Sequence, residues 1–275
     1  MDDLVLLATF EAMPEGEPGH ESLDAAFQAR GVDARWVVWD DPSVDWNSGL
    51  VVVRATWDYD DRLPEFLTWV RSVPRLLNGA AVFTWNTDKA YLTQLAAAGV
   101  PVVPTAVATP DTVADEAAAY AVAVVKPTVG AGGRGVQVVE RGSAPVLDGT
   151  GPWIVQPLVE SVRTEGETSL FVIGGRPTSQ YRKVPPSGSI LVHEHLGGKT
   201  YAVPLDAEAT DLAIRAVEGA SDLLERDLAY ARVDMMRLDD GRLLVSELEL
   251  VEPGLYLDVD DLNAGPFVDM VLTHL

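Results

Sequence analysis

The acidic residues around Asp240 have the types and spacing of a site for divalent cations. Within residues 234–249, Asp240-Gly241 is a strong signal for a two-residue hairpin turn. That turn places Asp234 directly opposite Glu247, with Glu249 two residues further along the same face. Opposed carboxylates repel each other, and a solvated acidic surface is the simpler interpretation in so acidic a protein. The same predicted face, however, carries an interior pattern of Met236, Leu238, Leu243 and Val245. We therefore predict that the three carboxylates bind Mg²⁺, which prefers oxygen ligands.

A glycine-rich stretch at residues 130–135 is the second element suited to chemistry. Its spacing matches a dinucleotide-binding fingerprint, but the segment that follows, residues 136–140, has the pattern of a strand rather than a helix. A P-loop is excluded because no Gly-Lys-Ser/Thr follows. We predict a hairpin whose glycine-rich tip approaches phosphates, with Lys126 near enough to contact the same anion. An ordinary mobile hairpin loop is the alternative.

The composition narrows the range of partners. The net charge is −22, which argues against nucleic acid or an anionic membrane as a partner. The chain has no cysteine, so disulfides and thiolate catalysis are excluded. No apolar run approaches the roughly 18 residues of a membrane span, and the acidic start does not resemble a signal peptide. We expect a cytoplasmic protein. Only four basic residues are lysines, namely Lys89, Lys126, Lys183 and Lys199.

Apolar periodicity indicates the elements that must position these residues. Strands are expected at residues 4–10, 34–39, 50–56, 101–108, 121–127, 136–140, 153–157, 168–173, 180–184, 230–238 and 242–250, and helices at 21–30, 64–73, 89–98, 206–226 and 261–274. The order of elements predicts an α/β fold that becomes α+β in its C-terminal part. We expect an N-terminal open α/β substrate domain at 1–85, a central lid subdomain at 86–155, and a C-terminal subdomain with the metal site at 156–275.

From residue 86 to the carboxyl end, the chain resembles the ATP-grasp superfamily. Lys89 in NTDKAYLTQL looks like the first ATP-binding lysine, and Lys126 in VVKPTVGAGGRGV looks like the second. The resemblance implies the ATP-grasp fold, with ATP and two Mg²⁺ ions as cofactors and Mn²⁺ as a substitute. It also implies roles for Gly132, Gly133 and Gly135 in the phosphate lid, for Gln156, Leu158 and Val159 at adenine, for Glu167 at the ribose, and for Asp234, Glu247 and Glu249 at the metal. The third metal ligand is often Asn in the superfamily, whereas this chain has Glu249.

Within the superfamily, the phrases VVVRATWDYDDRLPEFLTWV and ELELVEPGLYL resemble the group that includes the cycloserine-forming cyclo-ligase and relatives of glutathione synthetase. Many relatives carry an arginine that faces the phosphates in a Gly-Asp-Phe-Arg-like phrase. This chain has Leu191 at that place. The candidates to replace the arginine are Arg182, Lys183, His193, His195 and Lys199.

The resemblance implies an ADP-forming carbon–nitrogen ligase that activates a small, amino-acid-like carboxylate as an acyl phosphate. Arg54, at the end of a predicted strand, is a candidate clamp for the substrate carboxylate, together with Arg182 and Lys183 as catalytic cations. A structural ion pair of Arg54 with Asp58 or Asp60 is the alternative. The alternative functions are an intramolecular cyclo-ligase for a ureido-amino acid and a nucleotide-binding protein without turnover. A homodimer is compatible with the sequence.

Overall fold

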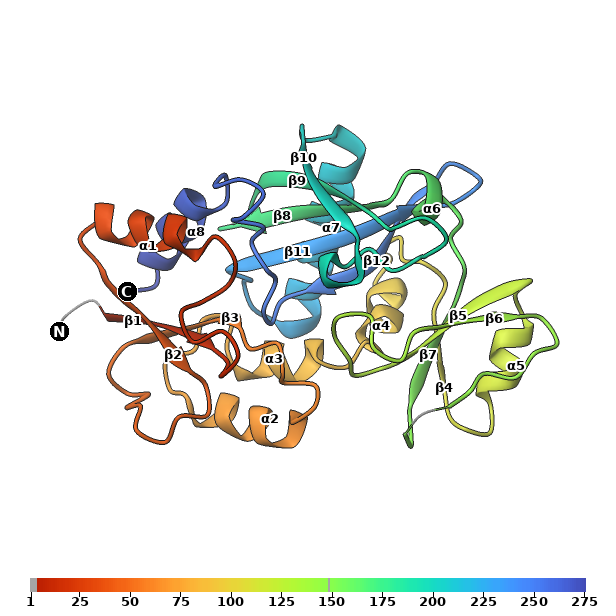
Figure 1. Ribbon diagram of the computed structural model, residues 1–275, viewed down its shortest axis with the longest axis horizontal. Helices are drawn as coiled ribbons and strands as arrows, with labels where there is room; N and C mark the ends of the chain where they lie inside the picture. Colours follow the sequence, from red (N-terminus) through yellow and green to blue (C-terminus); the bar gives the residue numbers. More distant parts are fainter. Residues whose placement is uncertain (1–3, 148) are drawn as a thin grey trace.

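The computed structural model describes residues 4–147 and 149–275, which form three β-sheets along the length of the molecule (Figure 1). The first sheet is parallel, as its near-continuous apolar strands predict, with the order β2-β1-β3. Helices α1 and α8 pack on one face, and α2 and α3 on the other. The elements of this region are β1 (Leu4–Thr9), α1 (His20–Ala29), β2 (Asp33–Val38), β3 (Leu50–Ala55), α2 (Leu63–Ser72), α3 (Ala80–Asn86) and α8 (Ala264–Leu272).

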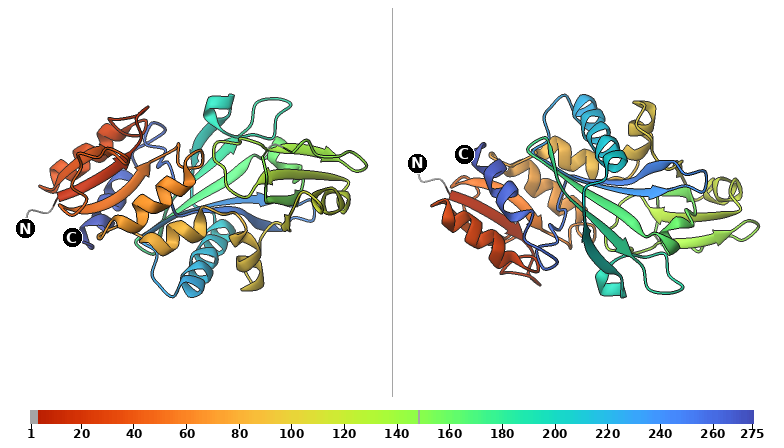
Figure 2. Two further views of the ribbon diagram at one scale, coloured as in Figure 1. Left: turned by 90° about the horizontal axis from the view of Figure 1, so that it is seen from below. Right: turned by 90° about the horizontal axis from the view of Figure 1, so that it is seen from above.

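The largest sheet is antiparallel and has the order β10-β9-β8-β11-β12. The long helix α7 begins after Asp206, whose carboxylate accepts the backbone N–H of Ala209 at 3.0 Å, and it packs its small apolar residues against this sheet. The other face is turned toward the small sheet and the cleft (Figure 2). The elements are α6 (Ser161–Thr164), β8 (Glu167–Ile173), β9 (Arg176–Val184), the 3₁₀ turn Glu194–Leu196, β10 (Lys199–Val203), α7 (Ala207–Leu224), β11 (Tyr230–Arg237) and β12 (Leu243–Glu249).

The third sheet is small and antiparallel, with the order β4-β7-β5-β6 and one short helix, α5, packed against it. The glycine-rich stretch connects β5 to β6, so the predicted hairpin is confirmed. The elements are α4 (Tyr91–Ala97), β4 (Ala106–Ala108), α5 (Val113–Ala118), β5 (Val122–Pro127), β6 (Gln137–Glu140) and β7 (Trp153–Pro157).

The region around Asn86 differs from the predicted single helix at residues 89–98. Helix α3 ends at Asn86 and α4 begins at Tyr91. Asn86 does not cap a helix, because its side-chain amide donates to the carbonyl of Leu248 at 2.8 Å and accepts the N–H of Leu250 at 2.7 Å. Asn86 thereby holds the start of the Lys89 segment against the end of β12. This contact joins residues far apart in the sequence, so local rules for helix caps could not predict it.

The three-part domain division stays a prediction. The predicted boundary between residues 155 and 156 falls inside β7, which is hydrogen-bonded to both β4 and β5. Among the described residues, no helix is both long and apolar enough to cross a membrane.

Candidate active site

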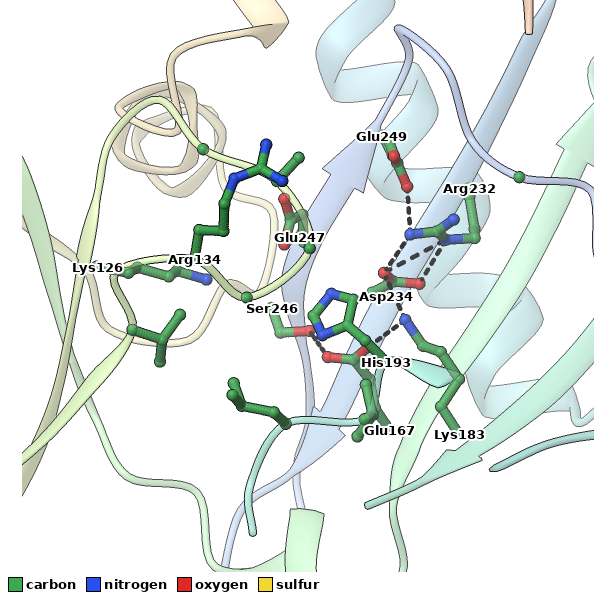
Figure 3. Close-up of a pocket in the computed structure, with 18 of the residues that line it drawn as sticks. Lys126, Arg134, Glu167, Lys183, His193, Arg232, Asp234, Ser246, Glu247 and Glu249 are labelled. Atoms are coloured by element: carbon green, nitrogen blue, oxygen red, sulfur yellow. Dashed lines mark hydrogen bonds and ion pairs between the residues drawn. The ribbon is translucent and has the colours of Figure 1, made fainter. Parts of the chain in front are cut away.

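Side chains of the small and large antiparallel sheets (Figure 3), together with loops that follow strands of the first sheet, line one cleft of about 700 Å³. The N-terminal region contributes Trp57 and Tyr59, the small sheet contributes Lys126 and Gln156, and the large sheet contributes residues on β8, β9, β11 and β12. A cleft at the junction of several subdomains is the usual place for a small-molecule site.

The β11–β12 pair confirms the predicted opposition of Asp234 and Glu247, although the turn itself is different. Leu238 donates to the carbonyl of Arg242 at 2.8 Å, so the loop has three residues rather than two. A bulge between Asp234 and Met235 then shifts the register back, which restores the opposed pair.

The bulge also changes which apolar residues share the face of these acids. We predicted that Leu243 and Val245 lie beside Glu247, and this is wrong. Both belong to the main core on the other side of the sheet, whereas Leu244 packs near Met236 and Leu238 in a small cluster at the cleft end. An extra residue in one strand reverses the alternation between the turn and the bulge.

Asp234 is the most heavily bonded acid of the cleft. It is 2% exposed, accepts the Ser169 hydroxyl at 2.6 Å, and forms ion pairs with Lys183 at 3.0 Å and with Arg232 at 3.1 Å. Burial alone would raise the pKa of Asp234, but Arg232 and Lys183 hold it well below its usual value. This carboxylate is therefore ionised in the folded protein.

Glu247 lies between the two predicted ATP-binding lysines. Lys89 Nζ is 3.1 Å from Glu247 Oε1 and donates to the carbonyl of Gly130 at 2.6 Å. Burial would raise the pKa of Glu247, but Lys89 and Lys126 lower it to about 2. The ammonium group of Lys126 forms no hydrogen bond or ion pair with any described residue, and burial lowers the pKa of this lysine. The cleft therefore presents an ammonium group that is free to contact an anion.

The three predicted metal ligands fit Mg²⁺ in chemistry but are occupied by cations as they stand. Glu249 forms an ion pair with Arg232, which also contacts Asp234, and Glu247 contacts Lys89. Within residues 4–147 and 149–275, no group of three histidine, cysteine or acidic side chains is arranged to hold a metal ion. Their donors are all carboxylate oxygens, which suit Mg²⁺. The metal triplet stays a prediction. It requires Asp234, Glu247 and Glu249 to exchange their lysine and arginine partners for Mg²⁺.

The glycine-rich loop lies across the cleft and contacts both of its sides. Gly132, Gly133 and Gly135 have φ values of 61°, 77° and 70°, a conformation that favours glycine. A Cβ on Gly133 would lie 3.2 Å from Nδ1 of His193. On the opposite side, the N–H of Ala131 donates to Asp60 at 2.9 Å, and Arg134 forms an ion pair with the same carboxylate. The sequence did not indicate this contact.

The remaining residues assigned to the nucleotide by resemblance line the cleft as well. Leu158 and Val159 lie at its wall, beside Gln156, whose amide donates to the Thr105 hydroxyl at 2.9 Å. Glu167 forms an ion pair with Lys183 and accepts the Ser246 hydroxyl at 3.3 Å. The adenine and ribose roles are untested and stay predictions.

Two of the three predicted catalytic cations do not reach the cleft. Arg182 is exposed and does not line it, because adjacent residues of β9 point to opposite faces and Lys183 takes the inner one. Arg54 is 0% exposed and donates twice to Glu17, at 2.9 and 2.6 Å, and to the carbonyl of Pro253 at 2.7 Å. The predicted alternative of a structural ion pair is correct in kind, although the partner is neither Asp58 nor Asp60.

Two arginines that the sequence interpretation missed line the same cleft as Leu191, which occupies the place of the absent arginine. Arg232 lies two residues before Asp234 on the same face of β11, so strand alternation from Asp234 could have found it. Arg134 lies in the glycine-rich loop. His193 and His195 also line the cleft, whereas Lys199 is exposed and outside it. Burial and the nearby Lys183 lower the pKa of His193 to about 4.

Comparison with known proteins agrees with this geometry. A curated relative, the cycloserine biosynthesis protein DcsG of Streptomyces lavendulae, is 34% identical over 272 residues, which cover 89% of this chain and 90% of that protein. The chain belongs to the DcsG family of ATP-grasp ligases. Its residues 5–78 also match the family model described as D-cycloserine synthetase DcsG, N-terminal domain.

Solved structures place this DcsG-family chain in the same fold. The crystal structure of D-cycloserine synthetase DcsG superimposes with a TM-score of 0.86 at 31% identity, covering 98% of this chain and 99% of that one. The ATP-grasp ligase PsnB, solved with a minimal precursor, Mg and ADP, superimposes with a TM-score of 0.64 at 17% identity, covering 98% and 96%. The predicted ATP-grasp fold and the relation to the cycloserine-forming enzyme are confirmed.

Proposed function

We propose that this chain is an ADP-forming carbon–nitrogen ligase that uses Mg²⁺-ATP to activate a small amino-acid-like carboxylate as an acyl phosphate, which an amine then attacks. The observation that carries this proposal is the meeting of two lysines from different parts of the chain beneath the glycine-rich loop. Lys89 reaches both the loop, at the carbonyl of Gly130, and Glu247 on β12. Lys126 faces the same cleft without a protein partner among the described residues.

Each part of the cleft has a task in this proposal. Lys89 and Lys126 bind phosphate oxygens as compact point charges, while Gly132 and Gly133 let the backbone approach them. Asp234, Glu247 and Glu249 would hold the Mg²⁺, which neutralises charge on the phosphates when bound. The contacts of the loop with Asp60 and His193 keep water from the reacting groups.

The nucleotide base and sugar fit the side of the cleft near β7. We propose that Gln156 and the backbone of Leu158 and Val159 contact adenine and that Glu167 contacts the ribose. Glu167 would then exchange part of its bonding with Lys183 for hydroxyl donors. We propose that Lys183, freed from Glu167 but still paired with Asp234, contacts the transferred phosphoryl group.

An intramolecular cyclo-ligase is the second candidate, and the DcsG relative favours it. That relative takes part in cycloserine biosynthesis and is similar to this chain over nearly its whole length. A cyclo-ligase needs no second amine, because the attacking nitrogen is part of the activated molecule. Release of phosphate from ATP with a ureido-amino acid as the sole co-substrate would therefore separate cyclisation from ligation of two molecules.

A nucleotide-binding protein without turnover was the third candidate, because Leu191 occupies the place of a phosphate-facing arginine. Arg134 and Arg232 both line the cleft and supply the positive charge from other elements. The opposed carboxylates of Asp234 and Glu247 have lowered pKa values, so both are ionised and suited to hold the Mg²⁺ that phosphoryl transfer from ATP requires. These features favour an active ligase.

The experiment is a phosphate-release assay with Mg²⁺-ATP and O-ureido-serine, followed by a panel of amino acids offered singly and in pairs. Substrate-dependent ADP formation is expected, with the product identified by mass spectrometry. Glu247→Gln should remove it, whereas Glu218→Gln on the exposed surface of α7 should leave it unchanged. Nucleotide binding without any substrate-stimulated ADP formation would contradict the proposal.

A further inference from the structure

Glu252 is a buried acid in the cleft that the proposed reaction leaves without a role. It follows the end of β12, is 3% exposed and lines the cleft. Its carboxylate takes part in no hydrogen bond or ion pair with the described residues, and its Oε2 is fully buried. A buried carboxylate without hydrogen-bond donors destabilises the fold when it is ionised. A group of this kind points to a ligand that supplies the donors.

The backbone at Glu252 and on its C-terminal side is held in place by hydrogen bonds to the N-terminal region. The carbonyl of Pro253 accepts a hydrogen bond from Arg54 at 2.7 Å, and the N–H of Leu255 donates to Glu17 at 2.7 Å. Because Arg54 and Glu17 are themselves paired, they hold the chain on the C-terminal side of Glu252 from within the N-terminal region. The indole N–H of Trp57 also donates to the carbonyl of Glu252, at 3.4 Å.

The other buried and partly buried acids of the cleft differ from Glu252 in that each has a basic partner; Glu194 and Asp258, which have none among the described residues, are exposed to solvent. Asp234 is paired with Lys183, Glu247 with Lys89 and Glu249 with Arg232. Burial, and then the negative charge of Glu249, raise the pKa of Glu252 well above its usual value. This part of the cleft is thus short of one positive charge with N–H donors.

The aromatic side chains beside Glu252 suit such a charge. Trp57 and Tyr59 line the same end of the cleft, and the ring of Phe10 lies 6.4 Å from that of Trp57. Aromatic faces attract ammonium groups, and an ammonium group carries three donors for a carboxylate. A divalent cation at Glu252 would have to draw Glu249 from Arg232 and Asp60 from Ala131 and Arg134, whereas an ammonium group requires neither change. Mg²⁺ demands several oxygen ligands in near-octahedral geometry.

We propose that Glu252, with Trp57 beside it, forms a subsite for the primary ammonium group of the substrate. The inference rests on the proposed function, because it assigns the substrate a free α-amine next to the carboxylate that is activated. It makes Glu252 a determinant of specificity: molecules of equal size without the amine would leave the carboxylate buried and unpaired.

The test compares Glu252→Gln, which keeps the shape and removes the charge, with the unchanged protein and with Glu218→Gln on the surface of α7. Each protein is assayed with O-ureido-serine and with its des-amino counterpart, 3-(ureidooxy)propionate. The unchanged protein and the control should prefer the amine-bearing molecule by about 100-fold or more in kcat/KM. The variant should lose most of that preference, mainly through KM, while its melting temperature stays equal or rises because a buried ionisable group without a hydrogen-bond partner is removed.

Calorimetric titration of the same two molecules, in the presence of a nonhydrolysable ATP analogue, separates this inference from the proposed function. If ATP is not used but the amine-bearing molecule still binds through Glu252, the function fails and the subsite stands. If ADP forms and Glu252→Gln keeps the full preference for the amine, the subsite is wrong and the function stands. A variant that keeps the preference but needs more Mg²⁺ would identify Glu252 as a metal ligand and overturn the inference. Absence of amine-dependent binding and turnover would overturn it as well.

Discussion

Replacing Arg54 with methionine separates a structural role from a catalytic one. The substitution removes two hydrogen bonds to Glu17 and one to the carbonyl of Pro253. The Glu17 carboxylate then stays buried without a basic partner, and the Pro253 carbonyl loses its arginine donor. Breaking a buried ion pair by removing one partner costs about 3–5 kcal/mol. For a chain of this size, the melting temperature should fall by roughly 6–20 °C.

The assay is thermal and urea unfolding followed by circular dichroism, on Arg54→Met, Glu17→Gln and the double variant. The double variant should recover part of the loss, because no isolated charge then stays buried, and the coupling between the two sites should be about 0.5–3 kcal/mol. Arg71→Met, at an exposed position in the last turn of α2, is the control and should change the melting temperature little. The reasoning is refuted if Arg54→Met keeps the melting temperature of the unchanged protein but abolishes turnover.

Three further predictions concern the cleft. Lys126→Ala should weaken binding of an ATP analogue about tenfold or more in calorimetry, because the ammonium group has no protein partner among the described residues. Lys199→Ala, at an exposed lysine outside the cleft, is the control. If Lys126→Ala binds the analogue as tightly as the unchanged protein does, Lys126 is not part of the nucleotide site. Asp60→Asn should loosen the glycine-rich loop, so that trypsin cleaves after Arg134 several times faster than in the unchanged protein. Asp61→Asn, at the exposed neighbouring residue, is the control. If both variants are cleaved at the same rate, the Asp60 contacts do not hold the loop. The folded protein lowers the pKa of Glu247 from 4.5 to about 2, so the stability that this group contributes is present above about pH 4.5 and is lost as the pH falls toward 2. Glu247→Gln should therefore flatten the acid side of the stability curve measured by urea unfolding, and an identical curve would contradict the Lys89–Glu247 pairing.

The local pattern of the sequence was sufficient to predict the strands and the glycine-rich loop that carry the candidate site residues. The glycine-rich tip between two strands follows from its flanking apolar segments, and both lysines predicted to bind ATP line the cleft. The opposition of Asp234 and Glu247 was predicted from a turn of the wrong length and is correct because a bulge compensates for the extra loop residue. A bulge has no strong sequence signal, so Leu243 and Val245, which lie between it and the turn on β12, were assigned to the wrong face.

The partners of buried charges were decided by the tertiary structure. Strand alternation requires Arg182 and Lys183 to point apart, but only packing of the large sheet determines that Lys183 faces inward. Arg54 meets Glu17, 37 positions away, and Pro253, 199 positions away, and Asp60 meets Arg134 across 74 positions. Sequence alone therefore determined which residues can act as cations, acids or phosphate-approaching glycines, because those properties belong to residue type and short-range spacing. The pairing of each buried charge with its partner depends on distant segments that meet around one cleft. For the same reason, only the tertiary structure shows that Glu252 has no basic partner among the described residues.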